Sequence, residues 1–377
     1  MSNFGFETEC HEVVNTFAHE VKGKTFLITG PTPGGIGAQT AISLAAASPS
    51  TIILVGRSVE KSQPTVDHIK RANSSINVRF VEADLSSMQS VRKAAQCILD
   101  DDGIPFINTI INNAGIMVPP YAQTEDGFES QFATNHLSHF LLVNKLMPKL
   151  LAAGNARVVN VSSVGNKYSG MNWEDIHFKT TYTPQRAYSQ SKTAQILFSV
   201  SLNKKLASKG VRSFALDPGS VETGLSKYIS LDIAEDMAQK IAGKSLVEAK
   251  ASRRKTVSQG SATTLVAALD PTLGHGVYLA DCKITSDPAC VNAWALDEGR
   301  VGILPMIICA DIAARASFLQ IDYYDVDNYL AEATLGSTQV DADAVCTLPV
   351  RGEWPPCRGP NAQTRGALLV RYRIGLA

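Results

Sequence analysis

The stretch TFLITGPTPGGIG at residues 25–37 decides the fold of this chain. Its first five residues are apolar or β-branched and predict a buried strand, and its glycine-rich turn runs directly into a helical pattern at Ile36–Ala47. Glycines let a backbone approach a pyrophosphate, and a helix N-terminus offers free N–H groups to it. The residues of this turn that we expect to bind a cofactor are Gly30, Gly34, Gly35, Ile36 and Gly37.

Short β-branched runs alternate with longer helical patterns along the rest of the chain. The runs lie at 25–29, 52–55, 78–81, 107–111, 157–161 and 211–216, and the helical patterns at 36–47, 59–72, 88–99, 128–151 and 186–207. This alternation predicts the α/β class, with a doubly wound parallel sheet (Rossmann fold) and helices on both faces. Ligands of such sheets bind at the carboxyl ends of the strands, so functional residues should follow each strand.

Composition excludes several classes of function. The 377 residues carry no net charge, so we expect neither a nucleic-acid partner nor an anionic membrane surface. The seven cysteines show no metal-ligand spacing, which predicts no metal and favours a reducing, cytoplasmic location. The N-terminus is polar rather than a signal peptide. The most apolar stretch, Val301–Phe318, contains Asp311 and Arg315, so we expect no membrane span and a small-molecule substrate.

The ends of strands two and three suggest which cofactor is bound. An NAD site usually has an acidic residue after strand two, but this chain has Arg57 there, and a guanidinium suits a 2′-phosphate. We therefore favour NADP(H), although Arg57 could also be an ordinary surface arginine. Asp84 and Leu85 follow strand three, where they could contact adenine; the alternative for Asp84 is an N-cap of the next helix.

Two further strand ends complete the predicted cofactor site. After strand four, NNAG at 112–115 has small residues that allow close cofactor approach and an Asn side chain able to tie strands together. After strand six, PGSVET at 218–223 turns the chain sharply toward the nicotinamide. The candidate cofactor contacts here are Asn113, Ala114, Gly115, Pro218, Gly219, Val221 and Thr223.

The strongest catalytic pattern is Tyr188-Ser-Gln-Ser-Lys192. Residues i and i+4 share one face of a helix, so the ammonium can lie beside the phenol and lower its pKa from about 10. A hydroxyl of Ser162 or Ser163 ends strand five and could bind a substrate oxygen. Asn135 is unfavourable within a helix and therefore suggests a functional or structural role.

Two histidines lie close to Asn135 in the same helical pattern. His136 and His139 are three residues apart, but no further ligand stands near them in the sequence. We interpret them as packing and surface residues rather than metal ligands.

Taken in order, these motifs resemble the short-chain dehydrogenase/reductase superfamily. The matches are TGPTPGGIG at 29–37, DL at 84–85, NNAG at 112–115, Asn135, VSS at 161–163, YSQSK at 188–192 and PGSVET at 218–223. The run NHLSHFLL at 135–142 and YLADCK at 278–283 resemble the retinol dehydrogenase, protochlorophyllide reductase and WW-domain oxidoreductase branch, including its fungal members. The glycine loop is one residue longer than usual and is stiffened by Pro31 and Pro33.

The resemblance implies a catalytic role for four residues. Ser163 would polarise the substrate carbonyl, Tyr188 would transfer the proton, Lys192 would lower the pKa of Tyr188 and grip the nicotinamide ribose, and Asn135 would hold a water. Tyr188 and Lys192 would thus contact the cofactor too. The implied activity is hydride transfer between NADP(H) and a ketone or secondary alcohol, a hydrophobic small molecule such as a secondary-metabolite intermediate. The alternatives are C=C reduction and a catalytically silent NADP sensor. The resemblance also leaves a homo-oligomer open to this chain.

We expect residues 1–297 to form one catalytic domain, with a substrate lid at about 225–258. The apolar residues of this lid would form either a substrate wall or an amphipathic helix over the core. We interpret Arg253, Arg254 and Lys255 as a solvated face, and the segment with Trp173, Asp175 and His177 as a flap near the substrate. Residues 298–377 form an atypical tail, with no sustained helical or strand period, which we expect to be poorly ordered.

Overall fold

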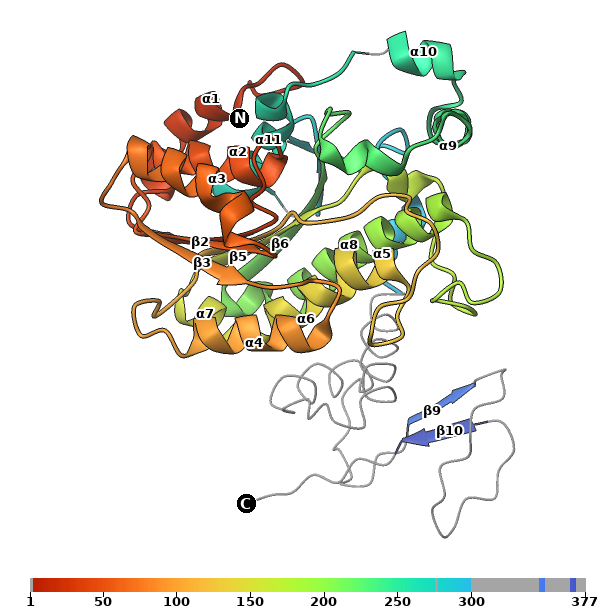
Figure 1. The fold of residues 1–377 in the computed structure, drawn as a ribbon, viewed down its shortest axis with the longest axis horizontal. Coiled ribbons are helices and arrows are strands. Elements are labelled where there is room, and N and C mark those ends of the chain that lie inside the picture. Colours follow the sequence, from red (N-terminus) through yellow and green to blue (C-terminus); the bar gives the residue numbers. More distant parts are fainter. Residues whose placement is uncertain (1–2, 252, 275–276, 300–345, 350–366, 371–377) are drawn as a thin grey trace. The chain divides into compact units, whose positions relative to one another are not determined.

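Eight strands form one sheet, which is parallel except at one edge (Figure 1). The strands are β1 (Thr25–Thr29), β2 (Thr51–Gly56), β3 (Asn77–Glu82), β4 (Thr109–Asn112), β5 (Ala156–Val161), β6 (Val211–Asp217), β7 (Tyr278–Ala280) and β8 (Lys283–Ile284). Their spatial order is β3-β2-β1-β4-β5-β6-β7-β8, and only β8 pairs antiparallel. The order reverses between β1 and β4, where doubly wound sheets bind their ligands. The predicted fold class is confirmed.

The computed structural model describes residues 3–251, 253–274 and 277–299 and the backbone of 346–349 and 367–370. The chain divides into two units, Met1–Val326 and Asp327–Ala377. In the second unit, β9 (Cys346–Pro349) and β10 (Ala367–Val370) pair antiparallel, which the sequence did not predict. The rest of the predicted tail after Gly299 lies outside the described residues, and the predicted boundary at 297/298 stays a prediction.

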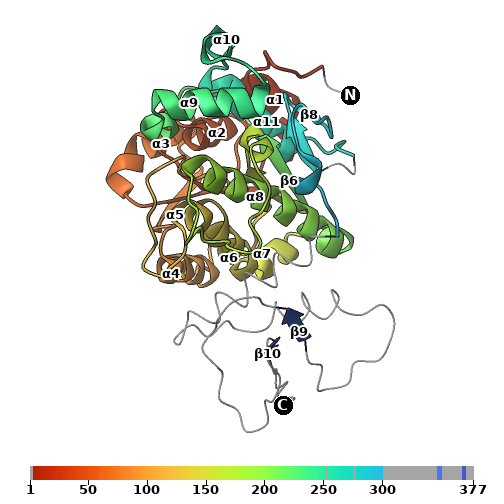
Figure 2. The same cartoon turned by 90° about the vertical axis from the view of Figure 1, so that its right-hand side faces the viewer.

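Helices cover both faces of the sheet, as Figures 1 and 2 show. One face carries α1 (Cys10–Thr16), α2 (Ile36–Ala45), α3 (Val59–Ala72) and α11 (Val257–Leu269). The other carries α4 (Met88–Leu99), α5 (Ser130–Phe132), α6 (Ser138–Lys145), α7 (Met147–Ala152) and α8 (Pro184–Leu206). The described residues also include seven short helical turns: η1 (Ala18–Glu20), η2 (Ala133–Leu137), η3 (Val164–Lys167), η4 (Ala207–Lys209), η5 (Gly224–Tyr228), η6 (Ala238–Ala242) and η7 (Ala293–Ala295).

Each face of the sheet has its own hydrophobic core, because successive strand residues point to opposite faces. In β1, Leu27 packs with the core under α4, α6 and α8, whereas Phe26 and Ile28 pack with the core under α1, α2 and α11. All three side chains are fully buried. This burial on both faces explains why β1 reads as a continuous apolar run rather than an alternating one.

The single helix predicted at 128–151 is divided into four segments, so that prediction was wrong in detail. The segment Ala133–Leu137 is a π-helix, which widens the turn around Asn135. The second break falls at Leu146, whose ψ of 4° lies outside the helical range, two residues before Pro148. Proline lacks an N–H and therefore tolerates only the first turn of a new helix, here that of α7.

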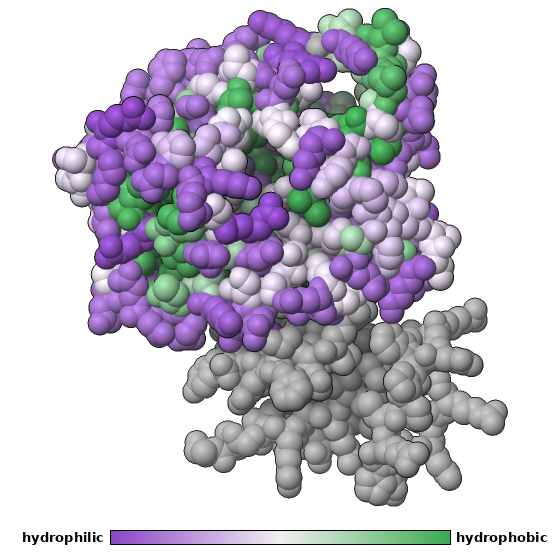
Figure 3. Space-filling model, viewed as in Figure 1, coloured by the Kyte–Doolittle hydropathy of each residue, from purple (hydrophilic) through white to green (hydrophobic). Residues whose placement is uncertain are grey.

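The predicted lid is helical and stands apart from the two helical layers (Figures 1 and 2). It contains η5, α9 (Leu231–Met237), η6 and α10 (Leu246–Ala251). Between Gly224 and Ala251, all of which the structure describes, no residue is buried. Leu231 is 68% exposed and Val247 78%, and Figure 3 shows hydrophobic side chains gathered around α10. None of these residues belongs to the buried hydrophobic core of the described chain.

Candidate active site

Ser163 and Tyr188 lie together at the carboxyl edge of the sheet. Ser163 is the N-cap of η3 just after β5, and its Oγ accepts a hydrogen bond of 3.0 Å from Gly165 N. Tyr188, in the second turn of α8, is 3% exposed and lies beside the Ser163 side chain, which lowers the pKa of its phenol. A Cβ at Gly165 would lie 3.0 Å from Tyr188 Cε1 and 3.2 Å from Ser163 Oγ, so only glycine leaves room for this pair. The neighbouring Ser162 instead donates to Lys192 O at 2.8 Å.

Lys192 lies on the same face of α8 as Tyr188, as the spacing predicts. Its Nζ is 5.6 Å from the centroid of the Tyr188 ring. The ammonium donates to Val161 O at 2.8 Å and to Gln195 Oε1 at 3.1 Å. Two of its three N–H groups thus have acceptors among the described residues.

The pKa of Tyr188 moves in the direction opposite to the sequence expectation. Burial raises the pKa of the Tyr188 phenol above its usual value, the hydrogen bond from Ser163 opposes this, and the charge of Asp217 adds to it. The same burial lowers the pKa of Lys192 to about 7, against an opposing effect of Asp217. Desolvation therefore outweighs the hydrogen bond from Ser163 at Tyr188 and the charge of Asp217 at Lys192, because both groups are almost completely removed from water.

Asn135 connects the loop after β4 to α8 through its side chain. Its Oδ1 accepts from Ile116 N at 2.8 Å, and its Nδ2 donates to Ile116 O and to Ser191 Oγ, both at 2.9 Å. A Cβ at Gly115 would lie 3.1 Å from Asn135 Oδ1, so this glycine allows the close approach. The helix-unfavourable residue thus has a structural role, and its predicted role in holding a water stays a prediction.

The histidines near Asn135 are both buried, so the surface interpretation was wrong. His136 packs against Phe132, Phe140 and Phe198, and burial lowers its pKa to about 3. His139 Nε2 is 2.9 Å from Thr29 Oγ1, and burial lowers its pKa to about 4. Among the residues that the structure describes, no three His, Cys, Asp or Glu side chains gather to hold a metal ion.

The glycine-rich loop packs tightly against the NNAG segment. Asn113 Nδ2 donates to Thr29 O at 2.9 Å and Asn113 N to Thr29 Oγ1 at 3.0 Å, so this side chain ties β1 to β4. A Cβ at Gly30, where φ is +72°, would lie 3.0 Å from Ala114 Cα. A Cβ at Gly37 would lie 2.5 Å from Gly30 O and would overlap Asn113 Nδ2. Two glycines of this loop are thus required by close packing between protein segments.

The N-terminus of α2 faces the end of this loop. Its N-cap is Gly35, which has no side chain to cap the first N–H groups of the helix, and Ile36 is its first residue. Gly34 has φ of +76° and open space around it. The donor set therefore fits a pyrophosphate, which uses N–H groups of this kind.

The residues that follow β2 and β3 differ in their exposure and in their contacts. Arg57 is exposed beyond β2. Asp84 Oδ1 accepts from Ser86 N at 2.9 Å and from Ser86 Oγ at 2.7 Å, whereas Ser87 is the N-cap of α4. The interpretation of Asp84 as the N-cap of this helix was therefore wrong, because the N-cap lies three residues later, at Ser87. Leu85 is 7% exposed and belongs to the core.

The loop after β6 adopts the predicted sharp turn. Gly219 has φ of +83° and donates its N–H to Asp217 Oδ1 at 3.1 Å, within the turn that Pro218 starts. Thr223 is the N-cap of η5, where its Oγ1 accepts from Leu225 N at 3.3 Å. Val221 pairs with Lys255, which places the loop beside the segment that leads into α11.

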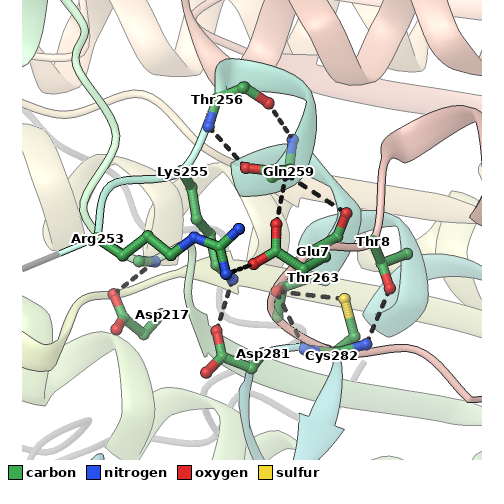
Figure 4. Close-up of polar contacts among 12 residues, drawn as sticks. Glu7, Thr8, Asp217, Arg253, Lys255, Thr256, Gln259, Thr263, Asp281 and Cys282 are labelled. Carbon is green, nitrogen blue, oxygen red and sulfur yellow. Dashed lines mark hydrogen bonds and ion pairs between the residues drawn. The ribbon is translucent and has the colours of Figure 1, made fainter.

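Lys255 corrects one sequence expectation (Figure 4). Arg253 and Arg254 are exposed as expected, but the Lys255 side chain is fully buried, and its Nζ lies 2.6 Å from Asp281 Oδ1. Its stem lies over Gly219, because a Cβ at that glycine would lie 3.0 Å from Lys255 Cδ. The sequence pattern did not predict the burial of Lys255, because three consecutive basic residues cannot be distinguished without the tertiary structure.

The flap is held to the body of the protein by buried polar groups. Gln190 Oε1 accepts from Asn172 N at 2.8 Å, and His177 is 3% exposed and packs against Phe128. Asp175 accepts from the backbone N–H groups of residues 179 and 180 and so closes a turn within the flap. Asp175 and His177 thus have structural roles, which the sequence alone could not distinguish from catalytic roles.

The lid contacts the turn that begins at Ser163. Tyr168 Oη donates to Asp236, and Lys167 Nζ donates to Ile241 O at 2.9 Å. Lys167 belongs to η3 and Tyr168 follows it. These two contacts join the predicted lid to the turn that carries the Ser163 hydroxyl.

Comparison with known proteins agrees with this geometry. The sequence pattern described as short chain dehydrogenase matches residues 24–234, which is more than half of the chain. The chain belongs to the short-chain dehydrogenase family. Family members are oxidoreductases that use nicotinamide cofactors and act on small molecules. In the part of the chain that the structure describes, no helix combines the length and apolar character needed to cross a membrane.

Relatives of this short-chain dehydrogenase include fungal and human proteins. Short-chain dehydrogenase/reductase prx1 of Penicillium roqueforti is 37% identical over 274 residues, covering 70% of this chain and 75% of the relative. Human polyprenol dehydrogenase is 37% identical over 262 residues, covering 67% and 76%. Human retinol dehydrogenase 13 is 38% identical over 212 residues, covering 56% and 63%. The predicted resemblance to fungal members of the retinol dehydrogenase branch is thus confirmed.

Solved structures share the fold. An uncharacterised protein from Mycobacterium paratuberculosis has a TM-score of 0.58 at 32% identity, covering 78% of this chain and 94% of its own. L-Sorbose reductase from Gluconobacter frateurii, solved with NADPH and L-sorbose, has a TM-score of 0.53 at 18% identity, covering 70% and 97%. At that identity the second likeness supports the fold alone.

Proposed function

We propose that this short-chain dehydrogenase transfers a hydride between NADP(H) and a ketone or secondary alcohol. The observation that carries the proposal is the adjacent pair of Ser163 and Tyr188, with Lys192 Nζ 5.6 Å from the centroid of the phenol ring. These three side chains meet at the carboxyl edge of the sheet, where ligands of doubly wound folds bind.

The hydroxyl pair suits the charge that develops when a carbonyl is reduced. NADP(H) supplies or accepts the hydride, and alkoxide charge builds on the substrate oxygen. Ser163 Oγ accepts from Gly165 N, and its own proton, which faces the Tyr188 phenol, can turn to that oxygen. Hydroxyl donors held in place at a developing alkoxide stabilise it. Tyr188 then gives its proton to this oxygen in reduction and takes it back in oxidation.

Arg57 supports the preference for NADP(H). It is exposed beyond β2, and residues 55–58 contain no carboxylate that would bind a 2′-hydroxyl and repel a 2′-phosphate. We expect Arg57→Ala to raise the KM for NADPH about tenfold while leaving that for NADH unchanged, because a charge-assisted contact to phosphate is lost. Arg71→Ala on the adjacent helix α3 is the matched control. Equal changes for both cofactors would contradict this role.

The lid supports a hydrophobic substrate, such as a secondary-metabolite intermediate. Ile233, Met237 and Ile241 are half-buried, and Ile241 O accepts from Lys167 of η3. Relatives of this chain are named polyprenol and retinol dehydrogenases. A cytoplasmic location is also part of the proposal, since Cys10, Cys97, Cys282 and Cys290 are free thiols among the described residues.

The test is NADPH consumption with a panel of hydrophobic ketones, aldehydes, enones and quinones. Turnover that disappears in Tyr188→Phe and persists in Tyr121→Phe, an exposed tyrosine, would support the proposal. Product analysis separates carbonyl reduction from C=C reduction. Tight NADPH binding without turnover on any substrate would instead favour a cofactor sensor.

A further inference from the structure

Gln195 connects the two catalytic segments through a single buried amide. It lies on α8, three residues after Lys192, and is completely buried. Its Oε1 accepts from Lys192 Nζ at 3.1 Å, and its Nε2 donates to Asn135 O at 2.8 Å. An ammonium can only donate and a carbonyl can only accept, so the orientation of the amide is fixed. We call this Lys192–Gln195–Asn135 connection the amide bridge.

The far end of the amide bridge is held by His139. Thr29 Oγ1 accepts from Asn113 N at 3.0 Å and from Ala114 N at 2.9 Å, so its own proton must point to His139 Nε2 at 2.9 Å. Nε2 is therefore the acceptor of the imidazole, and Nδ1 carries the proton. Nδ1 donates to Asn135 O at 2.9 Å. His139 thus connects the Asn135 backbone carbonyl, which accepts from Gln195, to Thr29 at the end of β1.

We propose that Gln195 is a positioning residue for Lys192, and that His139 fixes the carbonyl on which the amide bridge rests. The proposal rests on the proposed function, in which Lys192 serves Tyr188 and the cofactor. The amide bridge fixes one N–H direction of the ammonium, and Val161 O fixes a second. Because an ammonium is tetrahedral, the direction of its third N–H is then fixed as well. Gln195 spans from Lys192 to Asn135 O by itself, with no water needed between them.

Removal of the amide oxygen would weaken the charged form of Lys192. The ammonium is 4% exposed, so bulk water cannot replace a lost acceptor, and burial already favours the neutral amine. Other titratable groups facing Tyr188 and Lys192 are His139 from α6, Asp217 from β6 and Tyr278 from β7. Among the described contacts, none of these three groups accepts a hydrogen bond from Lys192 Nζ, so none could replace the lost Gln195 oxygen. Tyr188 would therefore ionise less readily once the amide bridge is broken.

The experiment compares Gln195→Met with wild-type enzyme in the full-length chain. In alcohol oxidation, kcat rises with pH as the catalytic phenol loses its proton. We expect the midpoint of this rise to move up by about half a pH unit or more, and the Kd for NADPH to weaken about fivefold. Asn203→Leu on the same helix is the matched control. It loses two contacts of 2.7 and 2.6 Å to Ser213, so it should lower the melting temperature only.

Gln195→Glu is the second variant, because it keeps an oxygen that faces Lys192 but loses the N–H that donates to Asn135 O. A carboxylate stabilises the neighbouring ammonium, so the midpoint of the kcat rise should not move up in this variant. An unchanged midpoint and Kd in a folded Gln195→Met, or an upward shift of the midpoint in a folded Gln195→Glu, would overturn the proposal. Failure of wild-type enzyme to turn over any substrate would count against the proposed function alone, since the Kd measurements test the amide bridge without turnover.

Discussion

Gly37→Ala should destabilise this short-chain dehydrogenase, although alanine is the better helix former. The new Cβ would lie 2.5 Å from Gly30 O and would overlap Asn113 Nδ2, so backbone must shift by about 1 Å to restore van der Waals contact. Overpacking of this kind costs about 1–3 kcal/mol. The two hydrogen bonds that Asn113 makes to Thr29 add about 1 kcal/mol each if they break.

Alanine recovers part of this cost, about 1 kcal/mol, through its helix propensity. The net loss in free energy of unfolding is then about 2–4 kcal/mol, which lowers the melting temperature by roughly 3–6 °C in a domain of about 300 residues. The assay is thermal unfolding without ligand, with Gly224→Ala as the control, since nothing lies within 4 Å of a Cβ there. A Gly37→Ala variant that melts within about 2 °C of wild type would refute the packing argument.

Three further predictions concern the site and its support. Lys255→Met should lower the melting temperature by a few degrees and weaken NADPH binding, because Asp281 and Gly219 lose their buried partner; unchanged NADPH affinity would contradict this. Gly165→Ala should reduce kcat about 100-fold in steady-state kinetics while the protein remains folded, because the new Cβ displaces the Tyr188 ring. Burial raises the pKa of Glu129 to about 7, so its stabilising effect should be present at acid pH and lost as pH rises through about 7. Urea unfolding should show a flatter pH dependence in Glu129→Gln.

Much of the fold could be read from local patterns. The strand ends predicted from β-branched runs agree with the observed strands to within two residues, and α3 and α4 begin and end where predicted. Local signals suffice here because burial on both faces of a parallel strand requires a continuous apolar run. The helix at 128–151 was harder, because the π-turn around Asn135 depends on the side-chain contacts of that residue with Ile116 and Ser191.

The candidate site was predictable where one short motif carries the chemistry. Tyr188 and Lys192 share a helix face because of their spacing, and Ser163 follows a strand end. The pKa of Tyr188 was not predictable from the same spacing, because burial depends on everything packed around the phenol. Gln195 and His139 carry no motif that distinguishes them from other buried polar residues, so the sequence did not single them out as partners of Asn135.

Sequence alone determines the strand and helix order, the glycine turn and the chemical groups that follow each strand, because these depend on residues close together in the chain. Tertiary structure alone decides that Lys255 is buried while Arg253 and Arg254 are exposed, and that Asn135 O meets both Gln195 and His139. These contacts join residues brought together by the packing of β6, α6 and α8, and the burial and charge around them are properties of that packing rather than of the local sequence.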